Sequence, residues 1–181
     1  MSIFNILKKQ RETEYKEYIK NHINNVHIVW ASLKSNPNFK DLVLEELQLS
    51  DHEYENMILI LDHDIEQHDK SKYDAEEFDA YRKEFYPVTP EEKEDNKNNM
   101  KRAFVHHYTH NHHHWDWYYE NKCEDKMPAK NIIHMIVDWA AMGLVPGNDS
   151  TIEWYNKNKN DIHLGEKQRI FAEKLINIIS Q

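Results

Sequence analysis

The chain has 181 residues, of which 39% are hydrophobic and 30% charged, so it is long enough for one sizeable core and too apolar to be disordered. Three glycines and five prolines are too few for the turns of an all-β fold, and they leave no glycine-rich phosphate loop. The formal net charge of −9 argues against a nucleic-acid polymer as partner, because such partners are held by basic contacts to phosphates.

The cysteine count and the hydropathy of the chain indicate the cellular compartment in which we expect the protein. A single cysteine, Cys123, excludes an internal disulfide and a cysteine-based zinc finger, and it is typical of a reducing compartment, so we expect a cytoplasmic protein. No apolar run reaches the roughly 18 residues that span a bilayer, and we expect neither a membrane partner nor a signal peptide. The composition is most unusual in histidine, with 13 in the chain and six of them between His106 and His114.

Apolar residues recur at helical spacing along the chain, and no alternating run rich in Val, Ile and Thr suggests a sheet. Capping patterns at Ser50, Asp74 and Thr89 mark three helix starts, and Pro90 occupies the first position of the third helix. Without a repeat or a low-complexity linker, we expect an all-α, single-domain helical bundle over residues 1–181. The predicted helices cover 3–33, 39–49, 51–68, 75–86, 90–119, 128–143, a short segment at 150–154, and 161–179.

The pair His68-Asp69 follows an apolar helix. An adjacent imidazole and carboxylate can serve one metal or a metal pair, and manganese and iron accept that mixture. The competing pair begins at His63, which lies about 140° around the helix from His68, so both histidines cannot face one site. His68 shares the buried stripe of Leu61 and Ile65, which favours it. A solvated helix end is the alternative interpretation.

Histidines on two other predicted helices are further candidates. His22 falls near the middle of the apolar face of the first helix, and His27 lies toward its edge. On one continuous helix over 90–119, His107 and His114 would share a stripe, with His113 on the adjacent one, so one face offers two or three imidazoles to a metal. Core hydrogen bonding for His22 and an adventitious surface cluster at 106–114 are the alternatives.

Asp138 lies within an apolar helix, on a face that also carries His134. A carboxylate there is costly to bury unless it is paired or bound to a metal. Each of the four signals is ambiguous alone, but their order along the chain is distinctive: a histidine, a His-Asp pair, a histidine cluster and an aspartate, each on a different predicted helix.

This order resembles the HD-domain superfamily of metal-dependent phosphohydrolases. The resemblance implies a helical bundle with a metal site between helices, in a core of about residues 15–142 followed by C-terminal helices over 150–180. It also implies a lysine after the pair, here Lys72, and extra histidines in members that bind two metals. This chain departs from them by placing the extra histidines in one predicted helix. The implied metal ligands are His22 (or His27), His68, Asp69, His107, His113, His114 and Asp138.

A closer match is to DUF5662, a small bacterial and phage family. Its pattern resembles His-Asp-x-Ser-Lys, then Glu-Glu-Phe with a following Tyr, then Asn-x-His-His-Trp, then Asp-Trp-x-Ala-Met. In this chain the corresponding residues are 68–72, 76–78 with Tyr81, 111–115, and 138–142. The match covers most of the chain and implies membership of the family, but it implies no activity.

Three functions follow as expectations. The first is hydrolysis of a phosphate ester or nucleotide by a metal-activated water, with one or two divalent ions (Mn, Fe, Zn or Mg) as cofactor. Lys72 would meet a phosphate oxygen, and His63 would shuttle protons. The second is an HD-type di-iron oxygenase acting on a small organic molecule. The third is a non-enzymatic metal-binding or interaction protein. Substrate identity and oligomeric state stay open.

Overall fold

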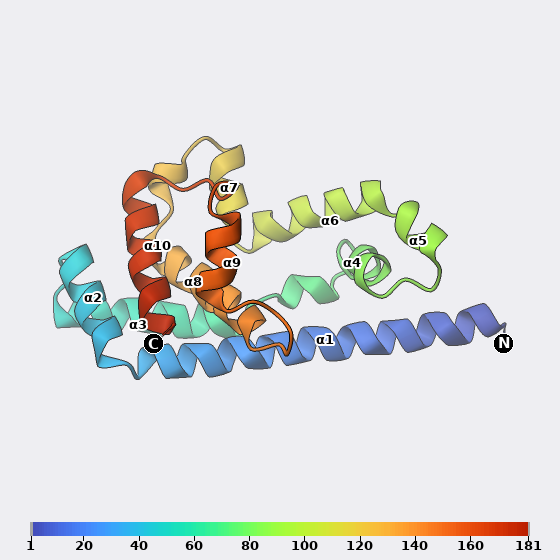
Figure 1. Cartoon of the computed structure of the whole chain (residues 1–181), viewed down its shortest axis with the longest axis horizontal. Coiled ribbons are helices and arrows are strands. Elements are labelled where there is room, and N and C mark those ends of the chain that lie inside the picture. Colours follow the sequence, from blue (N-terminus) through green and yellow to red (C-terminus); the bar gives the residue numbers. More distant parts are fainter. Residues whose placement is uncertain (1, 181) are drawn as a thin grey trace. The chain divides into compact units, whose positions relative to one another are not determined.

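The computed structural model describes residues 2–180, and within that range it contains helices and no strand (Figure 1), so the all-α prediction is confirmed. The elements are α1 (Ile3–Lys34), α2 (Pro37–Leu47), α3 (Asp51–Glu66), the 3-10 helix η1 (Lys70–Tyr73), α4 (Phe78–Phe85), α5 (Pro90–Glu94), α6 (Lys97–His110), α7 (Trp115–Glu120), η2 (Glu124–Lys126), α8 (Ala129–Gly143), α9 (Thr151–Asn158) and α10 (Glu166–Ile179).

The chain divides into two compact units. Unit 1 comprises Met1–Ile23 and Asp69–Asn111, and unit 2 comprises Asn24–His68 and His112–Gln181. The chain therefore passes from one unit to the other within α1, after His68 and after Asn111. Whether the two units fold as one domain is a separate question, so the single-domain expectation stays a prediction.

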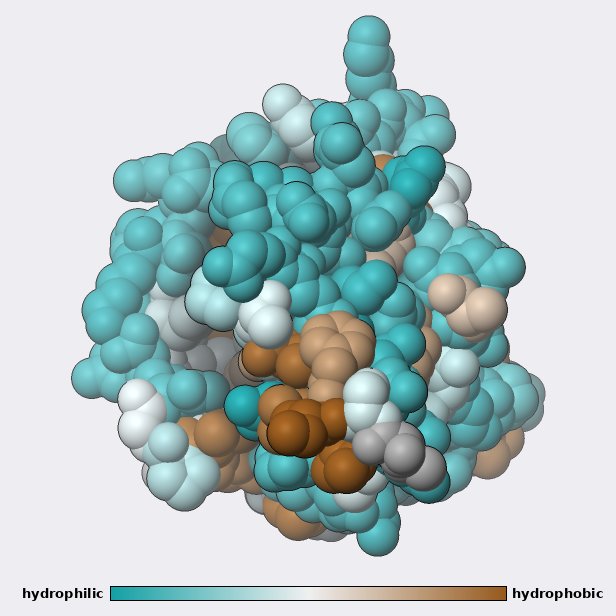
Figure 2. All heavy atoms as spheres, turned by 90° about the vertical axis from the view of Figure 1, so that its right-hand side faces the viewer, coloured by the Kyte–Doolittle hydropathy of each residue, from teal (hydrophilic) through white to brown (hydrophobic). Residues whose placement is uncertain are grey.

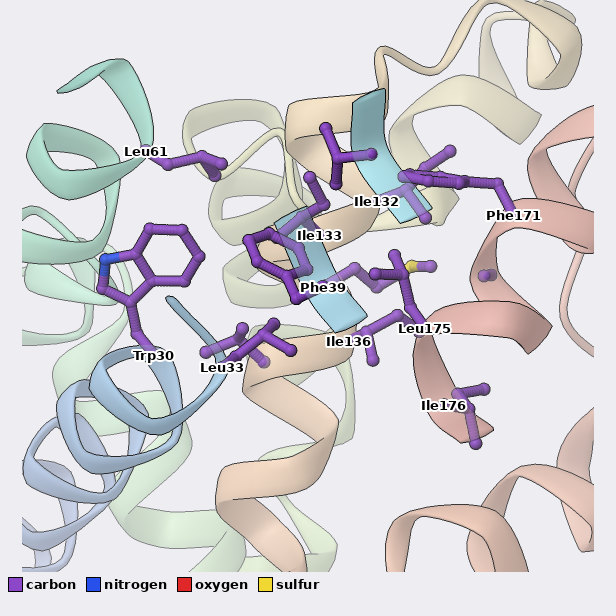
Figure 3. Packing of buried hydrophobic residues seen from close by; sticks show 14 of the residues in the cluster. Trp30, Leu33, Phe39, Leu61, Ile132, Ile133, Ile136, Phe171, Leu175 and Ile176 are labelled. Carbon is purple, nitrogen blue, oxygen red and sulfur yellow. The ribbon is translucent and has the colours of Figure 1, made fainter. Parts of the chain in front are cut away.

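The core of unit 2 is built around α8, which is apolar on nearly all sides. Its isoleucines pack against side chains of α1, α2, α3 and α10 (Figure 3). Full burial of one such side chain contributes about 1.5–3 kcal/mol, which explains why a helix with so few polar positions is stable here. The labelled core residues are Trp30, Leu33, Phe39, Leu61, Ile132, Ile133, Ile136, Phe171, Leu175 and Ile176.

Unit 1 has a smaller and more aromatic core. Tyr15 and Ile19 of α1 pack against Tyr81 of α4 and Ala103 of α6. Beside this core, the fully buried guanidinium of Arg82 is compensated by carboxylates on α4 and α5. The aromatic side chains and this ion pair hold α4, α5 and α6 together.

The predicted helix over 90–119 is wrong: the structure divides it into α5, α6 and α7. Asn96, which is 1% exposed, separates α5 from α6, and its side-chain amide donates to the carbonyl of Ala80. At Asn111 the backbone leaves the helical region, with φ −119° and ψ 85°. The Asn111 amide donates to Ser71 Oγ at 2.8 Å and to the carbonyl of His107 at 2.9 Å, which stabilises the break.

Three other predicted boundaries need correction. Helix α4 starts at Phe78 rather than after Asp74, because Asp74 ends the 3-10 helix that precedes it. Helix α3 ends at Glu66, before the His-Asp pair. Helix α10 starts at Glu166 instead of 161. Ile162 is buried in the non-helical segment before it, and the carbonyl of Ile162 accepts a hydrogen bond from the side chain of Arg169.

The other capping predictions are confirmed. Ser50 and Glu53 form a complete capping box at α3, and Thr89 caps α5 ahead of Pro90. A capping box at Ser150 opens α9.

The first two turns of α1 leave apolar side chains in solvent, with Ile3 77% and Ile6 54% exposed. Figure 2 looks toward this end of the chain and shows a small hydrophobic group on a mostly hydrophilic surface. Among residues 2–180, no helix combines the length and the hydropathy needed to cross a membrane.

Candidate metal centre

Unit 2 contains a buried group of three histidines and one aspartate, which we call the unit 2 cluster: His68, His113, His134 and Asp138. His68 follows the end of α3, and His113 lies in the turn between α6 and α7. His134 and Asp138 are one turn apart on the same face of α8. The three imidazoles are at most 5% exposed, and the side chain of Asp138 is 15% exposed.

The atoms of the unit 2 cluster have the spacing of ligands to one ion. The Nε2 atoms of His68 and His113 lie 3.6 and 3.8 Å from the two carboxylate oxygens of Asp138, beyond hydrogen-bond length. Each of the three histidines can offer a ring nitrogen such that these atoms lie within 4.8 Å of one another. Two atoms that are each about 2.1 Å from one ion lie roughly 3–4 Å apart, so the separations of 3.6 and 3.8 Å between Asp138 and the two histidines fit.

The chemistry of the unit 2 cluster also favours a cation. His68 Nδ1 and His134 Nε2 are 2.9 Å apart, so one ring donates a hydrogen bond to the other. Only one of these two nitrogens can carry a proton, so the two rings cannot both be imidazolium ions. Burying a carboxylate is costly, and a divalent ion would offset that cost. These residues therefore fit a metal.

Unit 1 contains a second buried group, the unit 1 cluster: His22, Asp69, Glu77 and His107. The carboxylate of Asp69 is its centre, with Nε2 of His22 and Nε2 of His107 each 3.3 Å from a different oxygen. Lys72 Nζ lies 2.5 Å from one of these oxygens. Asp69 itself has φ 56°, a left-handed conformation that Asp tolerates better than most residues. Such a conformation at a buried carboxylate indicates a functional position.

Glu77 is 0% exposed and holds two histidines. Its oxygens accept from Nδ1 of His106 at 2.8 Å and Nδ1 of His107 at 2.9 Å. Burial alone would raise the pKa of Glu77, but the hydrogen bonds from His107 and His106 outweigh it and lower that pKa. His107 thus lies between two carboxylates, with Nδ1 toward Glu77 and Nε2 toward Asp69. Burial alone would lower the pKa of His107, but its hydrogen bonds to Asp69 and Glu77 outweigh burial and raise that pKa.

The predicted site residues fall into both clusters. His68, His113 and Asp138 lie in the unit 2 cluster, whereas His22, Asp69 and His107 lie in the unit 1 cluster with Lys72 beside them. The ring of His114 is half-buried and lies 4.4 Å from that of His113, at the start of α7. The side chain of His63 is exposed on α3, and its role as a proton shuttle stays a prediction. Whether the ligands serve one ion or two also stays a prediction.

The helical stripes predicted for residues 106–114 are wrong, because α6 ends at His110. His107 precedes the break and belongs to unit 1, whereas His113 follows it and belongs to unit 2. The extra histidines are therefore not confined to one helix. Sequence reasoning did not assign His134 or Glu77 as site residues. The signals for them were the four-residue spacing from His134 to Asp138 and the place of Glu77 in the Glu-Glu-Phe motif.

Comparison with known proteins identifies a family but no activity. The model described as "Family of unknown function (DUF5662)" matches residues 11–181. No curated protein and no solved structure matches the chain. The resemblance to HD-domain proteins therefore rests on the pattern of site residues alone.

Proposed function

The chain belongs to the DUF5662 family, whose function is unknown, and we propose that it is a metal-dependent hydrolase of a phosphate ester. The observation that carries this proposal is the unit 2 cluster, in which ring nitrogens of His68 and His113 and the carboxylate of Asp138 have the spacing of metal ligands, beside a third buried imidazole, that of His134. The order of the site residues, which resembles that of HD-domain phosphohydrolases, supports the choice of reaction.

The residues of the unit 2 cluster would hold the ion. Imidazole nitrogen mixed with carboxylate oxygen suits Mn, Fe or Zn better than Mg, which prefers oxygen ligands. A bound divalent ion supplies a water of lowered pKa and neutralises charge on the phosphoryl oxygens. His134 would orient His68 through their hydrogen bond rather than bind the ion, because a His68 that donates through Nδ1 presents the lone pair of Nε2 toward Asp138, while the remaining proton of a neutral His134 lies on its Nδ1.

The residues of unit 1 form a separate cluster, which in a two-metal enzyme would hold a second ion. Lys72 is the cation beside Asp69, and its side chain is 17% exposed, so its ammonium group has limited access to solvent. That it binds a phosphate oxygen stays a prediction, and a cation in this role fits an acidic protein that must hold an anion. His22 and His107 flank Asp69 and keep its carboxylate in place.

Elemental analysis of the untagged protein tests the proposal. We expect one or two equivalents of Mn, Fe or Zn in the wild type, and a loss of at least one equivalent in His113→Ala and in Asp138→Asn. The control is His110→Ala, which removes an exposed histidine of the same run. No stoichiometric metal after reconstitution, or equal metal in Asp138→Asn and wild type, would overturn the proposal.

Activity then separates the reaction classes. We expect the metal-loaded protein to release phosphate from a generic aryl phosphate, and Lys72→Met to raise the KM for that substrate more than it lowers kcat. Two irons per chain with a visible absorption band, and oxygen uptake without phosphate release, would favour the di-iron oxygenase. Several weakly held ions that are unaffected by Asp138→Asn would favour a non-enzymatic metal-binding protein.

A further inference from the structure

Unit 2 contains a cavity whose lining residues include none of the proposed metal ligands. Its volume is about 480 Å³, within the usual range for small-molecule sites, which is roughly 300–1,000 Å³. It lies at the C-terminal end of α8, and residues 147–149 and the start of α9 complete its walls. Trp139, Met142 and Trp154 provide its apolar surface, and Asn148 and Asp149 provide polar groups.

The indole rings of Trp139 and Trp154 form one aromatic wall of the cavity, and Tyr155 packs against Trp139. The centroids of the two indole rings are 5.0 Å apart, at an interplanar angle of 51°. Trp139 also stacks against the buried Tyr155, with 6.2 Å between centroids. Trp154 nevertheless stays 36% exposed. An indole kept partly in solvent at the edge of a cavity offers a face on which a planar ring can stack.

The cavity is close to the unit 2 cluster along α8. Met142, which lines it, lies four residues after Asp138 and eight after His134, so the three side chains share one face of the helix. One helical turn separates Asp138 from Met142, about 6 Å along the axis. If the phosphate of a substrate is bound by the ion at Asp138, the part of the substrate attached to that phosphate would thus lie at the cavity.

The polar groups that line the cavity indicate which kind of planar ring it can bind. Asn148 donates through its amide nitrogen to the carbonyl of Met142, which turns its amide oxygen into the available acceptor. The carboxylate of Asp149 accepts from Lys157 at 2.6 Å through one oxygen, and its second oxygen is a further acceptor. Acceptors beside an aromatic wall match a heterocycle that carries amino or imino N–H groups on its edge.

We propose that this cavity binds the nucleobase of the substrate, so that the phosphate ester cleaved at the metal is a nucleotide. The inference rests on the proposed hydrolase function for the phosphate, but binding of the base requires only Trp139, Trp154 and their polar neighbours. Base binding and hydrolysis are therefore measured separately.

The binding experiment uses nucleosides, which carry no phosphate, and the metal-loaded protein. We expect adenosine or guanosine to quench tryptophan fluorescence saturably, and Trp154→Ala to weaken that binding about tenfold, while Trp154→Phe changes it less than threefold. Tyr119→Ala removes an exposed aromatic ring that does not line the cavity, and it should leave binding unchanged. Absence of saturable quenching at millimolar nucleoside, or equal affinity in Trp154→Ala and wild type, would overturn the inference.

Kinetics distinguish failure of this inference from failure of the proposed function. We expect the KM for a nucleoside monophosphate to be at least tenfold lower than that for ribose 5-phosphate, and Trp154→Ala to remove this difference. Equal KM values for the two substrates, with phosphate released from both, would overturn base recognition and leave the hydrolase standing. Saturable nucleoside binding without any phosphate release would refute the hydrolase instead.

Discussion

At the residue scale, Glu77 is the group whose position matters most to the histidines of unit 1. It is fully buried, and it fixes both His106 and His107 through their Nδ1 atoms. Glu77→Gln keeps the shape but replaces one acceptor by a donor, which would face a ring N–H. We expect the free energy of unfolding to fall by about 1–3 kcal/mol, measured by urea denaturation.

The neighbouring Glu76 is exposed and supplies a matched control. Glu76→Gln should change stability by less than about 0.5 kcal/mol. The imidazole ¹⁵N signals of His107 should also change in Glu77→Gln, because the variant lacks the anionic acceptor that holds a proton on Nδ1. Unchanged ¹⁵N signals would contradict the positioning role, even if the variant is less stable.

Glu92 gives a prediction on pH. The hydrogen bond from the buried Arg82 holds the pKa of Glu92 below its usual 4.5, although burial opposes the shift. A carboxylate with a depressed folded-state pKa contributes stability above its unfolded pKa and loses it as the pH falls through the folded pKa. We therefore expect the Tm of the wild type to fall more steeply than that of Glu92→Gln from pH 5 toward pH 3. Parallel curves would refute this assignment.

Most site residues could be found from the sequence, because a histidine or aspartate stands out at a position where helical spacing predicts burial. His68, Asp138 and His22 were found in this way. The partners of these residues were harder to predict. The sequence places His134 on the same helix face as Asp138, and it places Glu77 in the acidic first turn of a predicted helix, but it indicates no contact for either residue. Only the packing of α4 against α6 brings Glu77 to His107.

At the scale of elements, the break after α6 decides which histidines can reach which cluster. Local propensity predicts one helix through residues 111–114, and the structure instead ends α6 at His110. Hydrogen bonds from Asn111 to Ser71 and His107 outweigh the cost of leaving the helix. Sequence patterns identify caps such as Ser50 because their partners are three residues away, but Ser71 is 40 residues from Asn111.

Asn111→Ala tests this account of the break. Loss of its side-chain hydrogen bonds should lower the free energy of unfolding by about 1–2 kcal/mol, and alanine should favour helix at this position. We expect the Cα chemical shifts of residues 111–113 to move toward helical values. Asn98→Ala, at an exposed position of α6, should leave those shifts unchanged. Non-helical shifts in Asn111→Ala would mean that other contacts maintain the break.

At the scale of the whole molecule, length, composition and apolar spacing were enough to predict an all-helical chain with an apolar helix over 128–143. They did not predict the division into two units. Each unit combines segments that are distant in the sequence, and the division falls inside α1 and between the consecutive residues His68 and Asp69. No change of composition marks those points, because both units are amphipathic helices of ordinary polarity.

The unit 2 cluster also predicts how metal should affect stability. Its ligands come from three separate segments, so an ion bound only by the folded chain would tie them together. At a free metal concentration 100 times the Kd, such binding adds about 2.7 kcal/mol, or roughly 5–10 °C in Tm for a chain of this size. We therefore expect a chelator to lower the Tm of the wild type by that amount, and metal to restore it.

Asp138→Asn should reverse the order of stability between the two conditions. With metal present, the variant lacks an anionic ligand and should unfold at a lower temperature than the wild type. Without metal, the wild type keeps a largely buried carboxylate that the ion no longer neutralises, whereas the amide of the variant carries no charge. The metal-free variant should therefore be at least as stable as the metal-free wild type. A variant that is less stable than the wild type by the same margin in both conditions would mean that Asp138 stabilises the fold without a metal.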